Sequence, residues 1–309
     1  MSRLVFAGSS DFAVPTLEAL LSGGWDVVGV LTQPERPAGR RRRPAPTPVD
    51  VCARARDCVV QTPRTLRAPE AVAALAGLRP DVLVVVDYGL ILPAEVLALP
   101  PDGCINGHAS LLPRWRGAAP IAHAILAGDA LTGVSIMAMD KGLDTGPVYK
   151  MQSVEIREDE TGGELRERLA ALCAELLPAT LPGILSGELQ PRPQDHSRTT
   201  YAGKLDPATA EIDWGEDAGL LARKIRAFSP RPGAWTPWGS ERLKLHRARA
   251  IAEHSGPPGR VWQAGPAGID VAAGDGSVRV LELQPPGGRV MSARDFLNGR
   301  PMLGARLGR

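Results

Sequence analysis

Short apolar runs alternate with helix-like segments along residues 1–185. Such runs with few polar interruptions are typical of strands buried on both faces, and their alternation with helices predicts a doubly wound α/β sheet. The expected strands are residues 4–7, 27–31, 81–86, 104–105, 134–139 and, at an edge, 149–156. The expected helices are residues 13–21, 48–57, 69–77, 117–128 and 161–185, and Pro178 and Pro182 should kink or break the end of the last.

Two of these helices have recognisable starts. Thr47 precedes Pro48, the preferred order of an N-cap residue and a first helical residue. Thr161 and Glu164 have the spacing of a capping box, in which each side chain bonds to the other residue's backbone N–H. Both threonines are therefore expected to begin helices.

The last third of the chain has a different pattern. A linker rich in Pro and polar residues at 190–197 is followed by short alternating runs that Gly and Pro separate. Such runs predict a small β-barrel, and the OB type is a common nucleic-acid module. After a helix at 218–228, the expected strands are residues 235–237, 243–250, 260–264, 268–272 and 278–284. We therefore predict a Rossmann-like domain at 1–189, a linker at 190–205 and an OB-like domain at 206–309.

Composition narrows the class of protein. A net charge of +2 creates no global field for nucleic acid, so any basic surface must be local. The cysteines at 52, 58, 104 and 173 lack C-x-x-C spacing, which favours reduced thiols in a cytoplasmic protein without a metal site. No stretch approaches the length of a membrane span, and no signal segment precedes the first apolar run. The turn FAGSSDF lacks G-x-G-x-x-G, which argues against a nicotinamide or flavin enzyme.

Three polar residues lie near the middle of the sheet pattern. Asn106 and His108 are two residues apart at the end of an apolar run, so in a strand their side chains point to the same face. The next strand is followed by Asp140 and by Asp144, the latter in the turn GLDTG. An amide, an imidazole and a carboxylate can hold a carbonyl oxyanion and move protons around it. The sequence leaves open whether Asp144 orients the imidazole or takes a proton itself. The other four histidines lack such neighbours and are given no role.

Residues 33–48 interrupt the sheet pattern with arginine and proline. The arginines are Arg36, Arg40, Arg41, Arg42 and Arg43, opposed by one acid, Glu35. Such a segment cannot form a core element and should be a mobile surface loop. Its charges are either a solvated run or a finger that contacts phosphates.

Several motifs together resemble the folate-dependent formyltransferases over nearly the whole chain. They are N-x-H-x-S-L-L-P at 106–113, RWRGAAPI, GLDTG, FAGSSDFAVPTLEAL, TQPERPAGR, VVVDYGLILP, TYAGKL, IRAFSPRPGAW and MSARDFLNG. The resemblance implies transfer of the formyl group of 10-formyltetrahydrofolate to the α-amino group of methionine on initiator methionyl-tRNA, for translation initiation. It implies that Asn106, His108 and Asp144 are catalytic, and that the five arginines and the OB-like domain at 206–309 contact the tRNA. The donor would lie against Tyr88, Gly89, Leu90, Ser110, Leu111, Leu112 and Pro113. We expect a monomer.

The chain departs from the family at two positions: Gly107 replaces a usual β-branched residue, and Asp87 a small apolar one. Two other functions stay open. A formyltransferase for a small amine, such as an amino sugar nucleotide, would share the three polar residues but leave the arginines unexplained. A non-catalytic RNA-binding protein would explain the arginines but leave Asn106, His108 and Asp144 idle.

Overall fold

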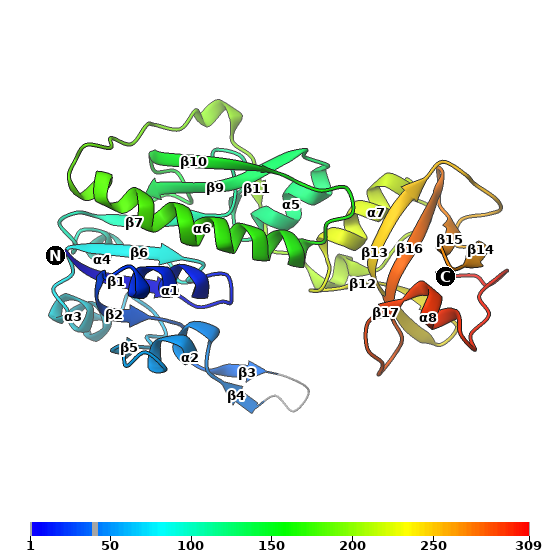
Figure 1. The fold of residues 1–309 in the computed structure, drawn as a ribbon, viewed down its shortest axis with the longest axis horizontal. Helices are drawn as coiled ribbons and strands as arrows, with labels where there is room; N and C mark the ends of the chain where they lie inside the picture. Colours follow the sequence, from blue (N-terminus) through cyan, green and yellow to red (C-terminus); the bar gives the residue numbers. More distant parts are fainter. Residues whose placement is uncertain (1, 39–42, 309) are drawn as a thin grey trace. The chain divides into compact units, whose positions relative to one another are not determined.

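The computed structural model describes residues 2–38 and 43–308, which form two compact units (Figure 1). The first unit comprises residues 1–117, 132–154 and 166–201, and the second comprises residues 118–131, 155–165 and 202–309. The second unit thus includes two segments that precede residue 189. The linear boundaries at 189 and 205 remain a prediction.

The first unit is built on a seven-stranded sheet with the order β10-β9-β7-β6-β1-β2-β5. The strands are β1 (Arg3–Gly8), β2 (Asp26–Leu31), β5 (Val60–Gln61), β6 (Val82–Val86), β7 (Cys104–His108), β9 (Leu131–Ala138) and β10 (Val148–Glu155). Neighbours from β5 to β7 pair in parallel, and every residue of β6 is buried. The predicted α/β class, central strand and edge strand are confirmed. β9, however, runs antiparallel to β7, so the sheet is mixed.

Three helices of residues 1–97 lie where they were predicted: α1 (Val14–Ser22), α2 (Pro48–Arg54) and α3 (Pro69–Gly77). The short helix α4 (Ala94–Leu97) was not predicted. The Thr47 side chain accepts a hydrogen bond from Asp50 N at 3.0 Å, which confirms the N-cap of α2. α2 ends three residues before the predicted Asp57, which has a φ of +56° that an α-helix does not allow.

The long helix α6 (Gly162–Leu185) begins at the predicted capping box. Thr161 N donates to Glu164 Oε2 at 2.9 Å, and Glu164 N donates to Thr161 Oγ1 at 3.3 Å. Pro178 and Pro182 lie inside the helix and do not break it. Buried apolar side chains on both sides of Pro178, such as those of Leu177 and Leu181, hold the turns that lack a proline N–H.

By length and composition alone, α6 would suffice to cross a membrane, so the expectation that no stretch approaches that length is wrong for this helix. Its residues Leu169, Cys173 and Leu177 follow a four-residue spacing and are fully buried. The apolar face therefore belongs to the core of the first unit.

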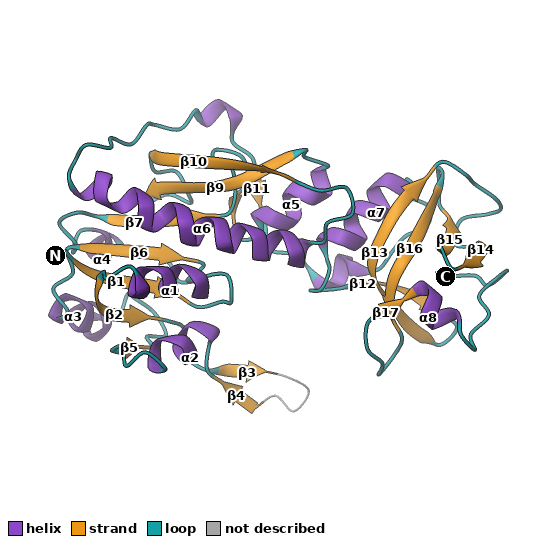
Figure 2. Ribbon diagram, viewed as in Figure 1, coloured by secondary structure: helices purple, strands orange, loops and turns teal. Residues whose placement is uncertain are grey.

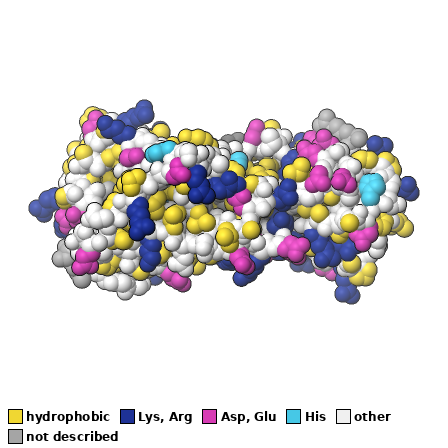
Figure 3. Space-filling view, turned by 90° about the horizontal axis from the view of Figure 1, so that it is seen from above, with side chains coloured by type: hydrophobic (Ala, Val, Ile, Leu, Met, Phe, Trp, Pro, Cys, Tyr) yellow, Lys and Arg dark blue, Asp and Glu magenta, His cyan; other side chains and the backbone are white. Residues whose placement is uncertain are grey.

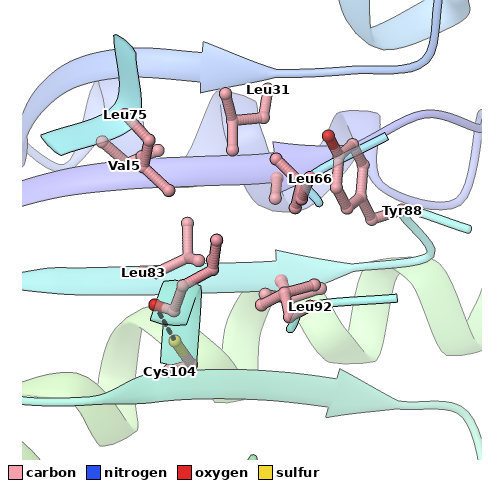
Figure 4. Close-up of a cluster of buried hydrophobic side chains, with 11 residues drawn as sticks. Val5, Leu31, Leu66, Leu75, Leu83, Tyr88, Leu92 and Cys104 are labelled. Carbon is pink, nitrogen blue, oxygen red and sulfur yellow. Dashed lines mark hydrogen bonds between the residues drawn. The ribbon is translucent and has the colours of Figure 1, made fainter. Parts of the chain in front are cut away.

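A second core cluster of the first unit fills the space beside β1 and β6 (Figure 4). Val5 and Ala7 alternate on β1, and Leu83 and Val85 on β6, so each strand presents every second residue to the cluster. Tyr88 is part of the same cluster and is 2% exposed. This packing holds the carboxyl end of β6, from which the loop at 87–93 leaves.

The arginine-rich segment contains two short strands, β3 (Arg36–Ala38) and β4 (Arg43–Ala45), which pair antiparallel (Figure 2). The expectation of a loop is therefore wrong for these six residues. Pro37 and Pro44 pair with each other, so one non-hydrogen-bonded position accommodates both missing N–H groups. Arg40, Arg41 and Arg42 lie outside the described residues.

The second unit contains a six-stranded antiparallel sheet with the order β12-β13-β16-β15-β14, in which β17 also pairs with β16. Its strands are β12 (Ala234–Trp238), β13 (Glu241–Ile251), β14 (Val261–Gly265), β15 (Gly268–Ala272), β16 (Ser277–Gln284) and β17 (Met291–Ser292). Each predicted strand is present, which confirms a second domain of short antiparallel strands. An open strand order suits the partly open OB type.

Three helices accompany this sheet in the second unit: α5 (Pro120–Ala127), α7 (Ala218–Ala227) and α8 (Ala293–Leu297). α5 starts three residues later than predicted, because Gly117 has a φ of +118° and lies in the short strand β8 (Arg116–Gly117). Short connecting elements are the strand β11 (Tyr201–Ala202) and the 3₁₀ helices His196–Arg198 and Pro207–Ala210. On the face shown in Figure 3, Lys and Arg form several separate groups with Asp and Glu between them.

Candidate active site

The strand β7 places the two central polar residues on one face of the sheet. Asn106 and His108 are 8% and 7% exposed, and Gly107 between them faces the other side. A Cβ built at Gly107 would lie 2.6 Å from Cys173 Sγ of α6. α6 therefore covers the Gly107 side, and the Asn106 and His108 side chains share the opposite face.

His108 is held between a backbone carbonyl and a carboxylate. Its Nε2 lies 3.0 Å from Trp115 O, and its Nδ1 lies 3.7 Å from Asp144 Oδ2. A carbonyl only accepts hydrogen bonds, so Nε2 carries a proton. A proton on Nδ1 would face the Asp144 carboxylate. Nδ1, beside the Asp144 carboxylate, is therefore the ring nitrogen that is available for proton transfer.

Asp144 reaches His108 by a route that the doubly wound pattern did not predict. Because β9 is antiparallel to β7, its last residue, Ala138, lies opposite Ile105 rather than beyond His108. The following loop folds back, and Asp144 adopts a φ of +52°. Its Oδ2 accepts a hydrogen bond from Gly117 N at 2.8 Å. Few non-glycine residues adopt this conformation, so surrounding contacts must impose it.

A buried arginine and a glutamine supply those contacts. Arg116 is 2% exposed, and its Nε and Nη2 donate to Gln194 Oε1 at 3.1 and 2.6 Å. Gln194 Nε2 in turn donates to Asp144 O at 2.9 Å and to Gly146 O at 2.7 Å. His196, which the sequence gave no role, lies with Nδ1 3.2 Å from Arg116 Nη2. Sequence reasoning missed this relay, because nothing in the pattern links Arg116 to a residue 78 positions away.

Asn106 contrasts with its neighbours. Within the described residues its side chain forms no hydrogen bond, although it is buried on a face with His108. The Asn106 amide atoms are not among the fully buried side-chain atoms that lack a partner, so the amide reaches the accessible part of this face. The Asn106 side chain is therefore available to a substrate oxygen.

The predicted donor residues at 110–113 hold their own turn. Ser110 Oγ donates to Arg114 O at 2.6 Å, and Ser135 Oγ donates to Ser110 O at 2.7 Å. Leu112 is buried with Met137 and Val148. The peptide bond between Leu112 and Pro113 is cis. Ser110 and Leu112 are thus already engaged by protein groups.

The loop at 87–93 is anchored by its backbone. Tyr88 O accepts hydrogen bonds from Ser9 Oγ at 2.9 Å and Gln33 Nε2 at 2.8 Å. The buried Tyr88 ring packs in the core of Figure 4, and burial raises the pKa of its hydroxyl. Gly89 has a φ of +78°, and Leu90 is partly buried against the same cluster. The side chains of Tyr88 and Leu90 therefore pack against the core rather than point outward.

Exposed apolar side chains stand instead at two positions that the sequence did not single out. Ile91 is 75% exposed on the loop after β6, and Leu143 is 59% exposed on the loop after β9. Apolar side chains left exposed on functional loops can contact a flat ring. Their place inside the motifs YGLILP and GLDTG was the only available signal.

The unusual Asp87 has a partner in α6. Arg166 Nη2 donates to Asp87 Oδ2 at 2.6 Å, and Ser10 Oγ donates to the same oxygen at 2.5 Å. Although burial lowers it, the pKa of Arg166 is raised overall by the Asp87 carboxylate. Asp87 thus adds a paired charge, which ties the start of the loop at 87–93 to the turn before α1 and to α6.

The predicted tRNA-contacting arginines are only partly described. Arg36 lies in β3 and Arg43 in β4. Arg40, Arg41 and Arg42 lie outside the described residues. Among the described residues, no group of three or more His, Cys, Asp or Glu could hold a metal ion.

Comparisons with known proteins identify the family of this chain. The formyl transferase family matches residues 2–181, and the formyl transferase C-terminal domain matches residues 204–301. The methionyl-tRNA formyltransferase of Xanthomonas axonopodis pv. citri (strain 306) is 52% identical over 301 residues, covering 96% of this chain and 97% of that protein. The methionyl-tRNA formyltransferase of Methylococcus capsulatus (strain ATCC 33009 / NCIMB 11132 / Bath) is 48% identical over 307 residues, covering 99% of each.

Among solved structures, the methionyl-tRNA formyltransferase from Clostridium thermocellum matches with a TM-score of 0.56 at 16% identity. That match covers 81% of this chain and 94% of the other. At this identity the likeness supports the fold alone.

Proposed function

Because the chain belongs to the formyl transferase family and groups there with the methionyl-tRNA formyltransferases, we propose that it formylates the α-amino group of methionine on initiator methionyl-tRNA, with 10-formyltetrahydrofolate as donor. One observation carries the proposal: the unpartnered Asn106 amide shares a face of β7 with His108, which lies between Trp115 O and the Asp144 carboxylate. Such a set suits acyl transfer to an amine.

Formyl transfer requires one bond to form and one to break at the formyl carbon. The amine nitrogen bonds to this carbon, the bond to the donor nitrogen breaks, and the proton lost by the amine ends on the donor nitrogen. Asn106 donates an amide N–H to the formyl oxygen as its negative charge grows. One such donor contributes about 3–4 kcal/mol to the transition state in comparable sites.

His108 and Asp144 divide the remaining work. His108 donates Nδ1–H to the same oxygen or to the departing nitrogen, while Trp115 O holds the ring through Nε2. Asp144, 3.7 Å from Nδ1, stabilises the protonated ring and accepts the amine proton directly or through water. Gly117 N, hydrogen-bonded to Oδ2, keeps the Asp144 carboxylate aimed at the ring.

The folate donor fits beside these residues. Ile91 and Leu143 offer exposed apolar contact for a flat pterin ring, and the backbone of Tyr88 and Gly89 is fixed by Ser9 and Gln33. Ser110, Leu111, Leu112 and Pro113 form the wall, and Leu112 is anchored in the core. We assign the donor to this region on these contacts and on the family.

The arginines of the β3–β4 hairpin suit the phosphates of the tRNA acceptor arm, because a guanidinium binds phosphate oxygens in a planar fork. A cytoplasmic location and a monomeric state belong to the same proposal. Cell fractionation and light scattering test these two points.

A panel of acceptors tests the proposed function. Labelled 10-formyltetrahydrofolate is supplied with charged initiator methionyl-tRNA, uncharged tRNA or an amino sugar nucleotide, and label transfer is measured. Transfer to charged methionyl-tRNA alone is the expected result. Transfer to the amino sugar instead would support the small-amine alternative, and no transfer to any acceptor would support a non-catalytic RNA-binding protein.

A further inference from the structure

Trp115, whose carbonyl oxygen lies 3.0 Å from His108 Nε2, has a backbone conformation that aromatic residues rarely adopt. Its φ is +61°, in the left-handed region, where the Cβ atom crowds the following carbonyl. Other contacts must therefore hold this conformation. Because the same stretch of backbone presents the oxygen to His108, these contacts also determine where the imidazole is held.

Thr200 supplies these contacts. Trp115 N donates to Thr200 Oγ1 at 2.9 Å, and Arg116 N donates to Thr200 O at 2.9 Å. Thr200 N in turn donates to Pro113 O at 3.4 Å. Thr200 and residues 113–116 belong to the same compact unit, although 85 positions separate Trp115 from Thr200 in the chain. One residue therefore binds the turn at 113–116 through three hydrogen bonds.

The two peptide groups that flank the Trp115 Cα are both bound by Thr200. The N–H of the first peptide donates to the Thr200 hydroxyl, and the N–H of the second donates to Thr200 O. The oxygen of the second peptide is the one that faces His108. Since the orientation of these two planar groups defines φ and ψ of Trp115, their hydrogen bonds fix the direction of that oxygen.

The direction of this carbonyl determines which nitrogen of His108 carries the proton. A neutral imidazole has one N–H, and a hydrogen-bond acceptor beside one nitrogen keeps the proton there. The Trp115 carbonyl keeps it on Nε2 and leaves Nδ1, 3.7 Å from Asp144 Oδ2, available for proton transfer. If the carbonyl turned away, either nitrogen could carry the proton and the ring could rotate away from Asp144.

We propose that Thr200 is a positioning residue for formyl transfer, which orients the Trp115 carbonyl and, through it, the His108 ring. This inference rests on the proposed function. Thr200 acts through the backbone of the turn at 113–116 rather than on a substrate. It belongs to the motif TYAGKL, but no role was predicted for this residue from the motif.

The neighbouring Thr199 offers a matched control. In the part of the chain that the structure describes, its buried hydroxyl has no hydrogen-bond partner. Thr199→Val therefore removes no hydrogen bond, whereas Thr200→Val, a change of the same shape, removes the acceptor of Trp115 N. Thr200→Ser keeps the oxygen and is the rescuing variant. Thermal melts check that each variant folds. If Thr200→Val does not fold, Thr200→Ala and Thr199→Ala repeat the comparison with smaller side chains.

The first measurement is the rate of formyl transfer to methionyl-tRNA, with the KM of donor and of tRNA. Thr200→Val should lower kcat about 10- to 100-fold with little change in either KM, because a displaced catalytic group affects the transition state rather than binding. Thr200→Ser and Thr199→Val should stay near the wild-type rate. A purely structural role would not separate kcat from KM in this way.

The second measurement is ¹⁵N NMR of the histidine-labelled enzyme without substrates, in which His108→Gln identifies the His108 signals. The wild type, Thr200→Ser and Thr199→Val should show a neutral ring with its proton on Nε2. Thr200→Val should show a mixture of the two tautomers, because the Trp115 carbonyl no longer selects one of them.

The outcomes separate this inference from the proposed function. A Thr200→Val enzyme with the wild-type rate and the wild-type tautomer would overturn the role of Thr200 and leave the function standing. Equal losses in Thr199→Val and Thr200→Val would also overturn it, because packing rather than the hydrogen bond would then be responsible. If the wild type formylates no acceptor, the proposed function fails, while the NMR comparison still reports whether Thr200 orients His108.

Discussion

Gly107 separates the two polar residues of β7 and faces α6, on the side of the strand opposite to their side chains. A side chain at this position would meet Cys173 Sγ at 2.6 Å and Leu177 Cδ1 at 3.3 Å. Burial raises the pKa of the Cys173 thiol to about 11, so this thiol is neutral at physiological pH and acts as an apolar packing group. Gly107 and Cys173 therefore fill this contact together.

Gly107→Val should therefore lower the free energy of unfolding by about 1–3 kcal/mol, because it overpacks a buried contact. Gly107→Val combined with Cys173→Ala should recover most of this loss, since the sulfur atom is the nearest obstacle. Urea unfolding of wild type, both single variants and the double variant measures the coupling. Additive losses would show that Cys173 is not what requires glycine at 107.

Some residues of the site could be placed from the sequence, and others could not. The motif spacing placed Asn106 and His108 on one face, because alternation in a strand is a local property. The antiparallel direction of β9, the position of Asp144 over His108 and the Arg116–Gln194 contact are set by tertiary packing, and no local pattern encodes them. Likewise, Tyr88 and Leu90 were identified by motif, whereas the structure exposes Ile91 and buries the Tyr88 ring.

At the scale of elements, the site depends on the loop after β9. The Gln194 side chain forms two kinds of hydrogen bond there. Its oxygen accepts hydrogen bonds from the Arg116 guanidinium, and its nitrogen donates to the carbonyls of Asp144 and Gly146. The element boundaries themselves were predictable to within a few residues, because apolar runs and caps define them. The connection between β9 and the segment at 194 was not.

Gln194→Glu should separate the contact with Arg116 from the contact with the Asp144 loop. A glutamate would neutralise the buried Arg116 but could not donate to Asp144 O, so the Asp144 loop should shift. We expect kcat to fall about tenfold or more while the melting temperature stays at or above the wild-type value. Gln194→Leu, which also removes the hydrogen-bond acceptor of Arg116, should lower both kcat and the melting temperature. Unchanged kcat in the Glu variant would mean that this relay does not position Asp144.

At the scale of the whole molecule, the binding of tRNA must draw on local basic surfaces, because the net charge is only +2. The arginine-rich sequence of the β3–β4 hairpin supplies one group of such basic residues. Arg→Ala at 40, 41, 42 and 43 together should raise the tRNA KM and make the salt dependence shallower, by about 0.7–0.9 per lost contact. Arg→Lys at the same positions should restore the slope in part but not the rate. If the arginines are only a solvated charge run, the tRNA KM and the salt dependence should be unchanged in the four-alanine variant.

If the β3–β4 hairpin opens the acceptor end of the tRNA, removing its arginines should also change which tRNA the enzyme prefers. A tRNA with a weak first base pair should then be the better substrate by kcat/KM for the wild type. Strengthening that pair should penalise the wild type far more than the four-alanine variant. Equal penalties in both enzymes would assign this discrimination to another element.

In the proposed mechanism, Asn106, His108 and Asp144 act together on one transition state. It is tested most directly by the single-turnover rate of formyl transfer to methionyl-tRNA, at saturating donor and acceptor, in His108→Ala and in Asn106→Ala and Asp144→Ala. Each variant should lose at least about 10²-fold with tRNA affinity intact, and combined variants should lose little more. His254→Ala, at an exposed histidine of the second unit, is the control and should keep the wild-type rate. A His108→Ala enzyme that keeps more than about a tenth of the wild-type rate would contradict the account.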